Sequence, residues 1–282
     1  PLMSERAVKH TYICATDSWA KEETTVSIAP HSFARGGMRR CHECAETADG
    51  YRTDSVAKFS MIHRSGARTA AFADAKMQMV AEYWAQQFNR ASPADAKIAF
   101  VVAQVLELPG RPDGPQRWAS LEPMLRGRYE KHNNNAGAVL SGSLAQAFSH
   151  FTHHASGGEL CICDIQGVGG SLFTDPQIHS RSSAGGSFGD GNLGANGIAR
   201  FLATHRCGPL CASLGLPKVE PKARPSGGGG GGMPMMMGGG GGGMPMMMGG
   251  GAGMTVGAHK MLERMMREMM AGGGGGGMPM VV

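Results

Sequence analysis

The chain has 282 residues, but most of its 45 glycines and 22 methionines lie after Pro225, so about 220 residues have the composition of a globular domain. Its formal charge of +5 comes from scattered Lys and Arg without interleaved aromatic residues, which argues against nucleic-acid binding. No apolar run approaches the roughly 20 residues of a membrane span, and no secretory hydrophobic segment opens the chain. Because the seven cysteines are an odd number, we expect a reducing, cytoplasmic environment without membrane association.

The first half of the chain predicts two strands, a glycine bend and a helix. Residues 24–28 are β-prone and lead into the run FARGGMR (residues 33–39), whose adjacent glycines permit a tight hairpin suited to covering a phosphate. Residues 55–59 alternate as in a half-buried strand, which places Lys58 on a face of a sheet. Residues 75–90 carry apolar side chains at helical spacing without Gly or Pro, which indicates an amphipathic helix.

The second half predicts further strands and then a late helix. Residues 97–108 are almost continuously apolar and indicate a central strand, which ends in a Gly- and Pro-rich stretch before the next element near Trp118. Residues 159–164 indicate another strand that leads into a glycine-rich loop, and a helix is expected from about residue 195 to 214. Because strands cluster early and helices late, the predicted fold class is α+β.

The densest polar region surrounds the glycine-rich loop. Asp164 ends the preceding strand, Gln166 follows it, and Asp175 lies beyond the turn. Carboxylates at strand ends are well placed to bind Mg²⁺ or to accept a proton. Taken alone, however, Asp-Pro and Asp-x-Gln are more often ordinary turn and cap residues.

A GxGxxG run, residues 189–194, opens the late helix. Such a run marks dinucleotide-binding folds but also simple helix-entry loops. Dinucleotide binding requires a strand immediately before the run and an acidic residue about 20 positions later. Residues 180–187 form a polar loop and no such acidic residue follows, so the sequence does not favour a dinucleotide site.

Three residues of types that bind metals lie close together near the end of the late helix. Cys207 and Cys211 are four positions apart, so they can face one way across a helical turn, with His205 alongside. This spacing favours structural zinc over two inert core cysteines. A fourth ligand must come from elsewhere, and the candidates are His150, His153, His154 and His179. The remaining pairs are expected to be free thiols (Cys41 and Cys44) and core residues (Cys161 and Cys163).

Several motifs, taken together and in order, resemble the alpha-kinase family, with the strongest likeness to its elongation factor 2 kinase branch. They are QAFSHFT, CDIQGVG, TDPQIH, FGDGNLG and HRCGPLC, within a likeness that covers roughly residues 6–216. The resemblance implies a two-lobed, protein-kinase-like α+β fold with a zinc-stabilised C-terminal lobe. We place the N-terminal lobe at residues 1–121, the C-terminal lobe at 122–218 and a Gly/Met-rich tail at 219–282.

The resemblance also implies roles for individual positions. Lys58 is expected to contact the ATP phosphates, Glu122 the adenine end of ATP, and Asp164 to be the catalytic residue. The implied Mg²⁺ ligands are Gln166 and Asp175. The implied structural zinc ligands are His150, His205, Cys207 and Cys211. The phosphate-covering loop contributes Arg35, Gly36 and Gly37. Further ATP-cleft positions, on the substrate side rather than over the nucleotide, are Gly189, Gly191, Asn192 and Gly194.

These assignments predict an atypical serine/threonine kinase that transfers the γ-phosphate of ATP to a protein hydroxyl, with elongation factor 2 as a candidate substrate. Phosphoryl transfer depends mainly on positioning and on neutralising the phosphates, which a lysine, Mg²⁺ and backbone N–H groups can supply. The H-R-D and D-F-G signatures of ordinary protein kinases do not occur. The alternative is a catalytically inactive, zinc-stabilised protein-interaction module.

Two regions depart from the family pattern. The relatives' helix carries a glutamate where this chain has Val80, and Glu82 lies on a different face. The tail repeats glycine runs followed by Met-Pro-Met, cannot bury a core and is expected to be disordered. Within it, residues 258–271 would form a helix with a Met-rich face, which suits either binding of a protein partner or a weakly helical linker.

Overall fold

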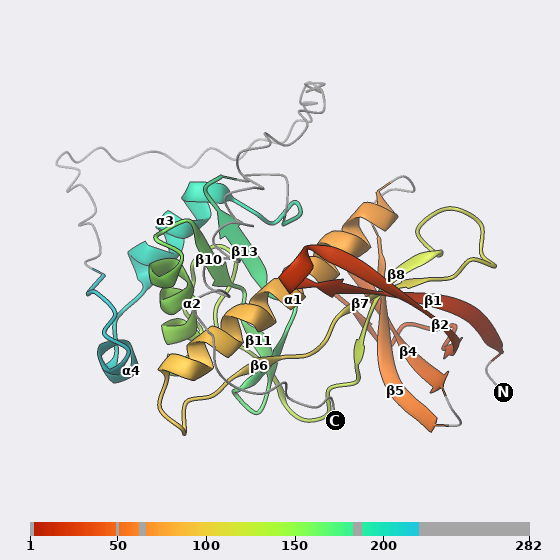
Figure 1. Cartoon of the computed structure of the whole chain (residues 1–282), viewed down its shortest axis with the longest axis horizontal. Helices are drawn as coiled ribbons and strands as arrows, with labels where there is room; N and C mark the ends of the chain where they lie inside the picture. The colour runs from red at the N-terminus through yellow and green to blue at the C-terminus, as the bar shows by residue number, and fades with distance from the viewer. Residues whose placement is uncertain (1–2, 49–50, 62–65, 183–187, 220–282) are drawn as a thin grey trace, which may run out of the picture.

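The computed structural model describes residues 3–48, 51–61, 66–182 and 188–219 (Figure 1). Residues 220–282, which hold nearly all of the tail expected to be disordered and the helix expected at residues 258–271, lie outside these ranges. None of the helices within them is long and apolar enough to cross a membrane.

An antiparallel sheet closes on itself in the N-terminal half of the chain (Figure 1). Its strands follow the order β2-β1-β7-β8-β5-β4-β3, and an additional pairing of β2 with β4 closes the sheet. The strands are β1 (Ser4–Ile13), β2 (Ser18–Ile28), β3 (Ala34–Arg35), β4 (Arg39–Ala48), β5 (Tyr51–Ser60), β7 (Gln104–Glu107) and β8 (Trp118–Pro123), with the short helix η1 (Cys14–Thr16) between β1 and β2. Apolar side chains from these strands form one buried cluster, which includes Val26, Ala57, Phe59, Leu106 and Leu121.

A long helix, α1 (Ala67–Ala91), packs on the other face of this sheet. Its Ala71 and Ala75 contact Val105 and Trp118 in a second buried cluster. Residues 55–59 of β5 are all buried, so the expectation of a half-buried strand was wrong. Alternate residues of β5 enter the interior cluster, whereas Lys58 projects from the opposite face, toward the C-terminal half of the chain.

The C-terminal half contains two small sheets covered by helices (Figure 1). One has the order β6-β12-β11-β9 and the other pairs β10 with β13. The elements are β6 (Ala99–Phe100), β9 (Tyr129–Lys131), α2 (Ser143–Ala155), β10 (Leu160–Cys163), β11 (Gln166–Val168), β12 (Leu172–Thr174), β13 (Gln177–Ser180), α3 (Gly194–Thr204) and α4 (Pro209–Ser213). Aromatic contacts among Phe88, Phe100, Phe148 and Phe173 join α1 to this half.

The predicted strand at residues 97–108 is two strands in two different sheets. Ala99 and Phe100 form β6 beside β12, whereas β7 begins only at Gln104 and belongs to the closed sheet. Between them Val101 donates its N–H to Phe173 O and accepts from the side chain of Gln78, and Val102 is exposed. The apolar run therefore crosses from one half of the molecule to the other.

The predicted helix at residues 195–214 is also interrupted. α3 ends at Thr204, His205 is extended, and α4 starts at Pro209 after an extended Gly208. Pro209 has no N–H to continue a helix, and proline is well suited to the first helical position. At the other predicted boundary, β8 runs to Pro123, so a lobe boundary between residues 121 and 122 falls within a strand.

Candidate active site

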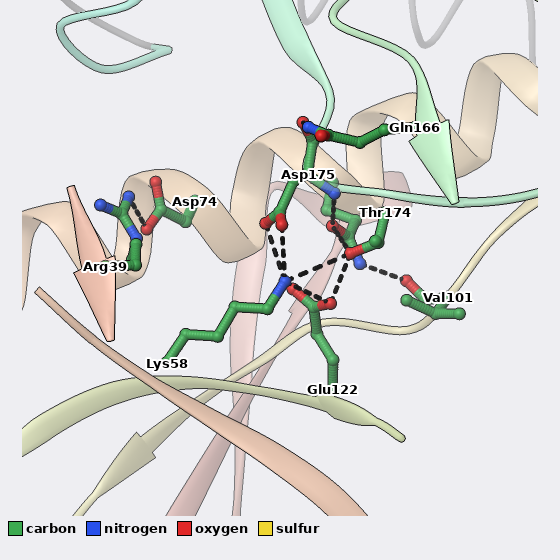
Figure 2. Close-up of polar contacts among 9 residues, drawn as sticks. Arg39, Lys58, Asp74, Val101, Glu122, Gln166, Thr174 and Asp175 are labelled. Carbon is green, nitrogen blue, oxygen red and sulfur yellow. Dashed lines mark hydrogen bonds and ion pairs between the residues drawn. The ribbon is translucent and has the colours of Figure 1, made fainter. Parts of the chain in front are cut away.

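A buried lysine lies between two carboxylates where the two halves meet (Figure 2). Lys58 Nζ is 2.8 Å from Glu122 Oε2 and 2.8 Å from each carboxylate oxygen of Asp175. In the antiparallel pairing of β5 with β8, Lys58 is opposite Ser120, so Lys58 and Glu122 project from the same face. Asp175 follows β12 and reaches Lys58 from the opposite half of the molecule. The ion pair of Lys58 with Asp175 therefore joins the two halves, whereas Lys58 and Glu122 both belong to the closed sheet.

The electrostatics of this group depend on burial and on the two opposite charges. Burial alone would lower the pKa of Lys58, but the Asp175 and Glu122 carboxylates outweigh it and hold that pKa well above its usual value. For Glu122 burial raises the pKa, and the Lys58 ammonium opposes this effect. Thr174 Oγ1 donates a hydrogen bond to Glu122 as well. Lys58 is thus held as a cation. The side chains of Lys58 and Glu122 are buried, whereas that of Asp175 is half-exposed.

Asp164 lies directly after β10 and adopts a left-handed conformation with φ 60°. Lys131 Nζ is 2.6 Å from Asp164 Oδ1. The next residue is held on both sides, because Ile165 N donates to Asn133 Oδ1 at 2.8 Å and Ile165 O accepts from His132 N at 2.8 Å. Asp164 is therefore fixed in a defined orientation beside a cation. Lys131 was not predicted, since a lysine in a short exposed strand carries no distinguishing pattern.

Gln166 and Asp175 approach each other from β11 and the end of β12. Gln166 pairs with Thr174 in the sheet, and its side-chain amide donates to Asp175 O at 3.1 Å (Figure 2). Asp175 has φ 50° and a half-exposed carboxylate. Amide and carboxylate oxygens are donors of the kind that Mg²⁺ prefers, so this pair fits the predicted metal site.

Gln78 of α1 supports the site from behind. Its Oε1 accepts from Asp175 N at 2.9 Å, and its Nε2 donates to Val101 O at 2.7 Å. Gln78 was not predicted as a site residue. It is a buried polar residue on the apolar face of α1, and a polar residue in such a position is the one signal in the sequence that could have indicated its role. Glu82 of the same helix instead accepts from Phe100 N at 2.7 Å. Among the described residues, therefore, the carboxylate partners of Lys58 come from β8 and the turn after β12, not from this helix.

The predicted glycine hairpin forms beside the strand of Lys58. β3 and β4 pair across the bend, where Gly36 N donates to Arg39 O at 2.9 Å. Cys41 of β4 lies opposite Lys58 of β5. Space around Gly36 and Gly37 is open, and Arg35 is exposed. The hairpin thus lies where it can approach a ligand of Lys58.

The GxGxxG loop lies across a cavity of about 360 Å³ from this hairpin. The cavity is lined by Arg39, Asp74, Met77, Gly189 and Gly191 among others, and Arg39 and Asp74 form an ion pair on one wall (Figure 2). A Cβ at Gly191 would lie 2.0 Å from Gln177 Oε1, so this glycine is required for close packing on β13. Asn192 Oδ1 accepts from Ser180 N and from Gly194 N. The loop borders this cavity, but Gly191 and Asn192 serve to dock it on β13.

A second cluster brings together the four predicted zinc ligands. The ligand atoms of His150, His205, Cys207 and Cys211 all lie within 4.8 Å of one another. Cys207 Sγ is 3.8 Å from His150 Nδ1 and 3.6 Å from His205 Nε2, and Cys211 Sγ is 3.7 Å from His205 Nε2. Tetrahedral zinc with bonds of about 2.0–2.3 Å separates its ligand atoms by about 3.5 Å, so the arrangement fits zinc. Burial lowers the pKa of both histidines to about 4, which keeps them neutral and able to bind metal.

The other cysteines behave as predicted. Cys41 and Cys44 are free thiols, and Cys161 and Cys163 are buried in the core. Cys207 precedes α4 instead of sharing a helix with Cys211, because the chain is extended between α3 and α4. The cluster is therefore built where the segment after α3, including α4 with Cys211, packs on α2, which supplies His150.

Comparison with known proteins places this geometry in a family. Residues 34–211 match the sequence model of the alpha-kinase family. The chain belongs to the alpha-kinase family. It is 41 % identical over 222 residues to alpha-protein kinase 1 of Dictyostelium discoideum, and 36 % identical over 232 residues to human eukaryotic elongation factor 2 kinase. These alignments cover 78 % and 76 % of this chain, but only 16 % and 30 % of the relatives. The chain thus spans less than a third of either relative.

The alpha-kinase fold is supported independently by solved structures. The alpha-kinase domain of myosin-II heavy chain kinase A, in complex with adenosine, superposes with a TM-score of 0.70 at 31 % sequence identity, covering 77 % of this chain and 95 % of that chain. The same domain has been solved in complex with AMP-PNP, with the same TM-score and identity. The predicted recognition of the family, the mixed sheet and helix content and the assignment to the alpha-type protein kinases are confirmed.

Within this alpha-kinase domain the predicted residues separate into two groups. Lys58, Asp175 and Gln166 meet where the two halves join, and the four zinc ligands meet in a separate cluster. The side chain of Glu122 is bound to Lys58. Its expected role at the adenine end of ATP therefore stays a prediction, as do the roles of the hairpin and of the GxGxxG loop.

Proposed function

We propose that this chain is an atypical serine/threonine kinase that uses ATP and Mg²⁺ to phosphorylate a protein hydroxyl. The observation that carries the proposal is the placement of Lys58 between Glu122 and Asp175 at the junction of the two halves. A cation held in that place can neutralise the phosphates of ATP, which is the main requirement of phosphoryl transfer. Family membership adds support, because related domains have been solved with adenosine and AMP-PNP.

Asp164 is the proposed catalytic residue. Its carboxylate would orient the acceptor hydroxyl and take its proton as the hydroxyl oxygen bonds to the γ-phosphorus and the bond from that phosphorus to the β,γ-bridging oxygen breaks, with ADP as the other product. Lys131, at 2.6 Å, holds the carboxylate in place. Gln166 and Asp175 would hold Mg²⁺, which supplies further neutralisation of the phosphate charge.

The protein substrate is a separate proposal. One relative is named for its action on elongation factor 2, and that protein is a reasonable first acceptor to test. The alternative of an inactive interaction module is not favoured, because Lys58, Asp164, Gln166 and Asp175 all carry the functional groups that transfer requires.

Structural zinc is proposed for the cluster of His150, His205, Cys207 and Cys211. It would tie the segment after α3 to α2, because His150 comes from that helix and the other ligands from the segment. Zinc in such a closed four-ligand site stabilises the folded state directly.

Transfer of labelled γ-phosphate from ATP with Mg²⁺ tests the proposed function. The acceptors are the chain itself and elongation factor 2, and acid hydrolysis of the product identifies the labelled amino acid. We expect phosphoserine or phosphothreonine that is lost in Asp164→Ala. Absence of labelling on every acceptor, by a folded protein with Mg²⁺ present, would contradict the proposal.

A further inference from the structure

A short segment, residues 132–135, lies between the loop that carries Asp164 and the GxGxxG loop. His132 and Asn133 bind the main chain of Ile165, on one side of Asp164. On the other side, Cys163 Sγ lies 3.9 Å from Asn135 Oδ1. Both chain neighbours of the proposed catalytic residue therefore contact this segment.

Asn135 also contacts the GxGxxG loop. Its Nδ2 donates to Gly191 O at 3.0 Å. Its backbone oxygen accepts from His179 Nε2 at 3.2 Å. One residue thus links the strand that precedes Asp164, a buried histidine of β13 and the middle of the loop.

His179 holds the same loop from the opposite side. Leu193 N donates to His179 Nδ1 at 3.1 Å, so this nitrogen carries no proton and Nε2 is the donor to Asn135 O. Burial lowers the pKa of His179, which agrees with a neutral ring. The ring is completely buried, and a Cβ at Gly197 would lie 2.3 Å from it. The histidine is therefore fixed in place by α3.

The loop depends on these contacts for its position. Gly189 has φ 70° and Gly194 has φ 59°, and glycine at such positions leaves the main chain intrinsically flexible. The loop nevertheless forms one wall of the cavity that faces Arg39 and Asp74. A loop with glycines at these positions keeps one defined conformation only when other residues hold it in place.

We infer that Asn135 is a positioning residue that sets the GxGxxG loop against the loop of Asp164 and thereby places the protein substrate for transfer. The substrate part of this inference rests on the proposed kinase function. The link between Asn135 and the loop rests on geometry alone, so the two parts can be tested separately.

The adjacent asparagines offer an isosteric test and its matched control. Asn135→Asp replaces the amide donor by a carboxylate oxygen, which then faces Gly191 O and repels it. Asn134 Oδ1 only accepts, from Ala136 N at 3.0 Å and Ala138 N at 2.8 Å, so Asn134→Asp keeps its hydrogen bonds. Both changes add one negative charge to the same turn, and they differ in the contact to the loop.

The first readout is kinetic and uses a mixture of serine- and threonine-containing peptides as acceptors. For Asn135→Asp we expect kcat/KM for the peptides to fall by about 10- to 100-fold, while KM for ATP stays within about twofold. Asn134→Asp should match the unmodified chain. If the two variants have the same peptide kinetics, the inference is wrong. If the unmodified chain phosphorylates no peptide and no other acceptor, the kinase proposal fails and the substrate part fails with it.

The second readout is hydrogen exchange of the amides of residues 188–197, which needs no activity. We expect faster exchange in Asn135→Asp than in Asn134→Asp, because the loop loses the hydrogen bond from Asn135 to Gly191 O. Equal exchange would overturn the positioning role whatever the kinetics. Thermal unfolding checks that both variants are folded. If Asn135→Asp is not, Asn135→Ala removes the amide contacts without adding a charge and is expected to give the same difference.

Discussion

Lys58 shows how a charged residue is kept ionised away from water. It is 8 % exposed, and it retains its charge because Asp175 and Glu122 compensate for the lost hydration. The three side chains come from two strands of the closed sheet and from a turn in the other half. Any substitution of one of them therefore alters the environment of the other two.

Replacing Lys58 by Met tests this dependence. Lys58→Met leaves the buried Glu122 carboxylate without its cation, so we expect the free energy of unfolding near pH 8 to fall by about 3–5 kcal/mol. Burial raises the pKa of Glu122 and Lys58 opposes this, so the pKa should rise further in the variant. A carboxyl group whose pKa is higher in the folded state than in the unfolded state destabilises the fold when it is ionised. This loss of stability is full above the folded pKa and becomes smaller as the pH falls through that pKa. The deficit measured by urea unfolding should therefore shrink as the pH is lowered from about 8.

A matched control for this variant is Lys131→Met, which removes the cation beside Asp164. Lys131 is 40 % exposed, so water can replace it and we expect a loss below about 1 kcal/mol. If Lys58→Met cost no more than Lys131→Met, or if its deficit did not change with pH, the account of the buried charges would be wrong.

The sequence drew attention to individual residues that belong to recognisable motifs, and it gave no indication of those outside such motifs. Lys58 follows a glycine bend, and Asp164 and Asp175 flank a glycine-rich turn. Lys131 and Asn135 have no such context, because their importance comes from contacts with residues 28 or more positions away. Gln78 is intermediate between the two groups. A polar residue on an apolar helical face can be recognised in the sequence, but its hydrogen-bond partners, Asp175 and Val101, cannot.

Helices and strands could be predicted where the apolar residues follow a clear period. The prediction failed where one apolar run passes from one sheet to another. The helix predicted at residues 75–90 exists as part of α1. The run at residues 97–108 contributes strands to two different sheets, because Val101, between the two strands, forms hydrogen bonds with Gln78 and Phe173. Buried strands on either side of such a turn have the same apolar composition, so composition does not locate the break. The interruption of the helix before Pro209 could have been predicted more easily, since a Gly-Pro pair is a recognisable helix breaker.

The zinc cluster is a prediction at the scale of elements, because it joins α2 to the segment after α3. We expect about one zinc per chain by elemental analysis. Cys207→Ser should lose the metal and lower the melting temperature by about 10 °C or more, since structural zinc contributes folding energy. Cys41→Ser, a substitution of a free thiol outside the cluster, is the control and should keep both the zinc and the melting temperature. Unchanged melting of a zinc-free protein would contradict the assignment.

The whole molecule brings together residues that no local pattern connects. Glu122 and Lys58 meet because β8 neighbours β5, and Asp175 meets them because β12 lies at the junction of the halves. The family resemblance anticipated the two-lobed arrangement, but the closure of the N-terminal sheet by β2 and β4 follows from strand order, which the sequence does not reveal. The meeting of these three side chains thus depends on the topology of the fold more than on any motif.

Both sites lie within the described residues, so shortening the chain tests how self-contained they are. A chain that ends at Val219 keeps the contact of Val219 N with Cys207 Sγ, and we expect its melting temperature to match the full chain within about 2 °C. A chain that ends at Gly215 also lacks the buried Leu216, and should be less stable by about 2–5 kcal/mol. Calorimetry of the two shortened chains compares them directly. A large loss already at Val219 would mean that residues 220–282 stabilise the domain.

The catalytic role of Asp164 is tested by comparing Asp164→Asn with the unmodified chain in both ATP binding and phosphate transfer. The substitution keeps the size of the side chain but removes the charge that Lys131 binds and the oxygen that would take the proton. We predict that the dissociation constant for ATP with Mg²⁺, measured by calorimetry, stays within about threefold, while kcat for transfer falls by at least about 100-fold. Transfer at an undiminished rate by a folded Asp164→Asn chain would contradict the account.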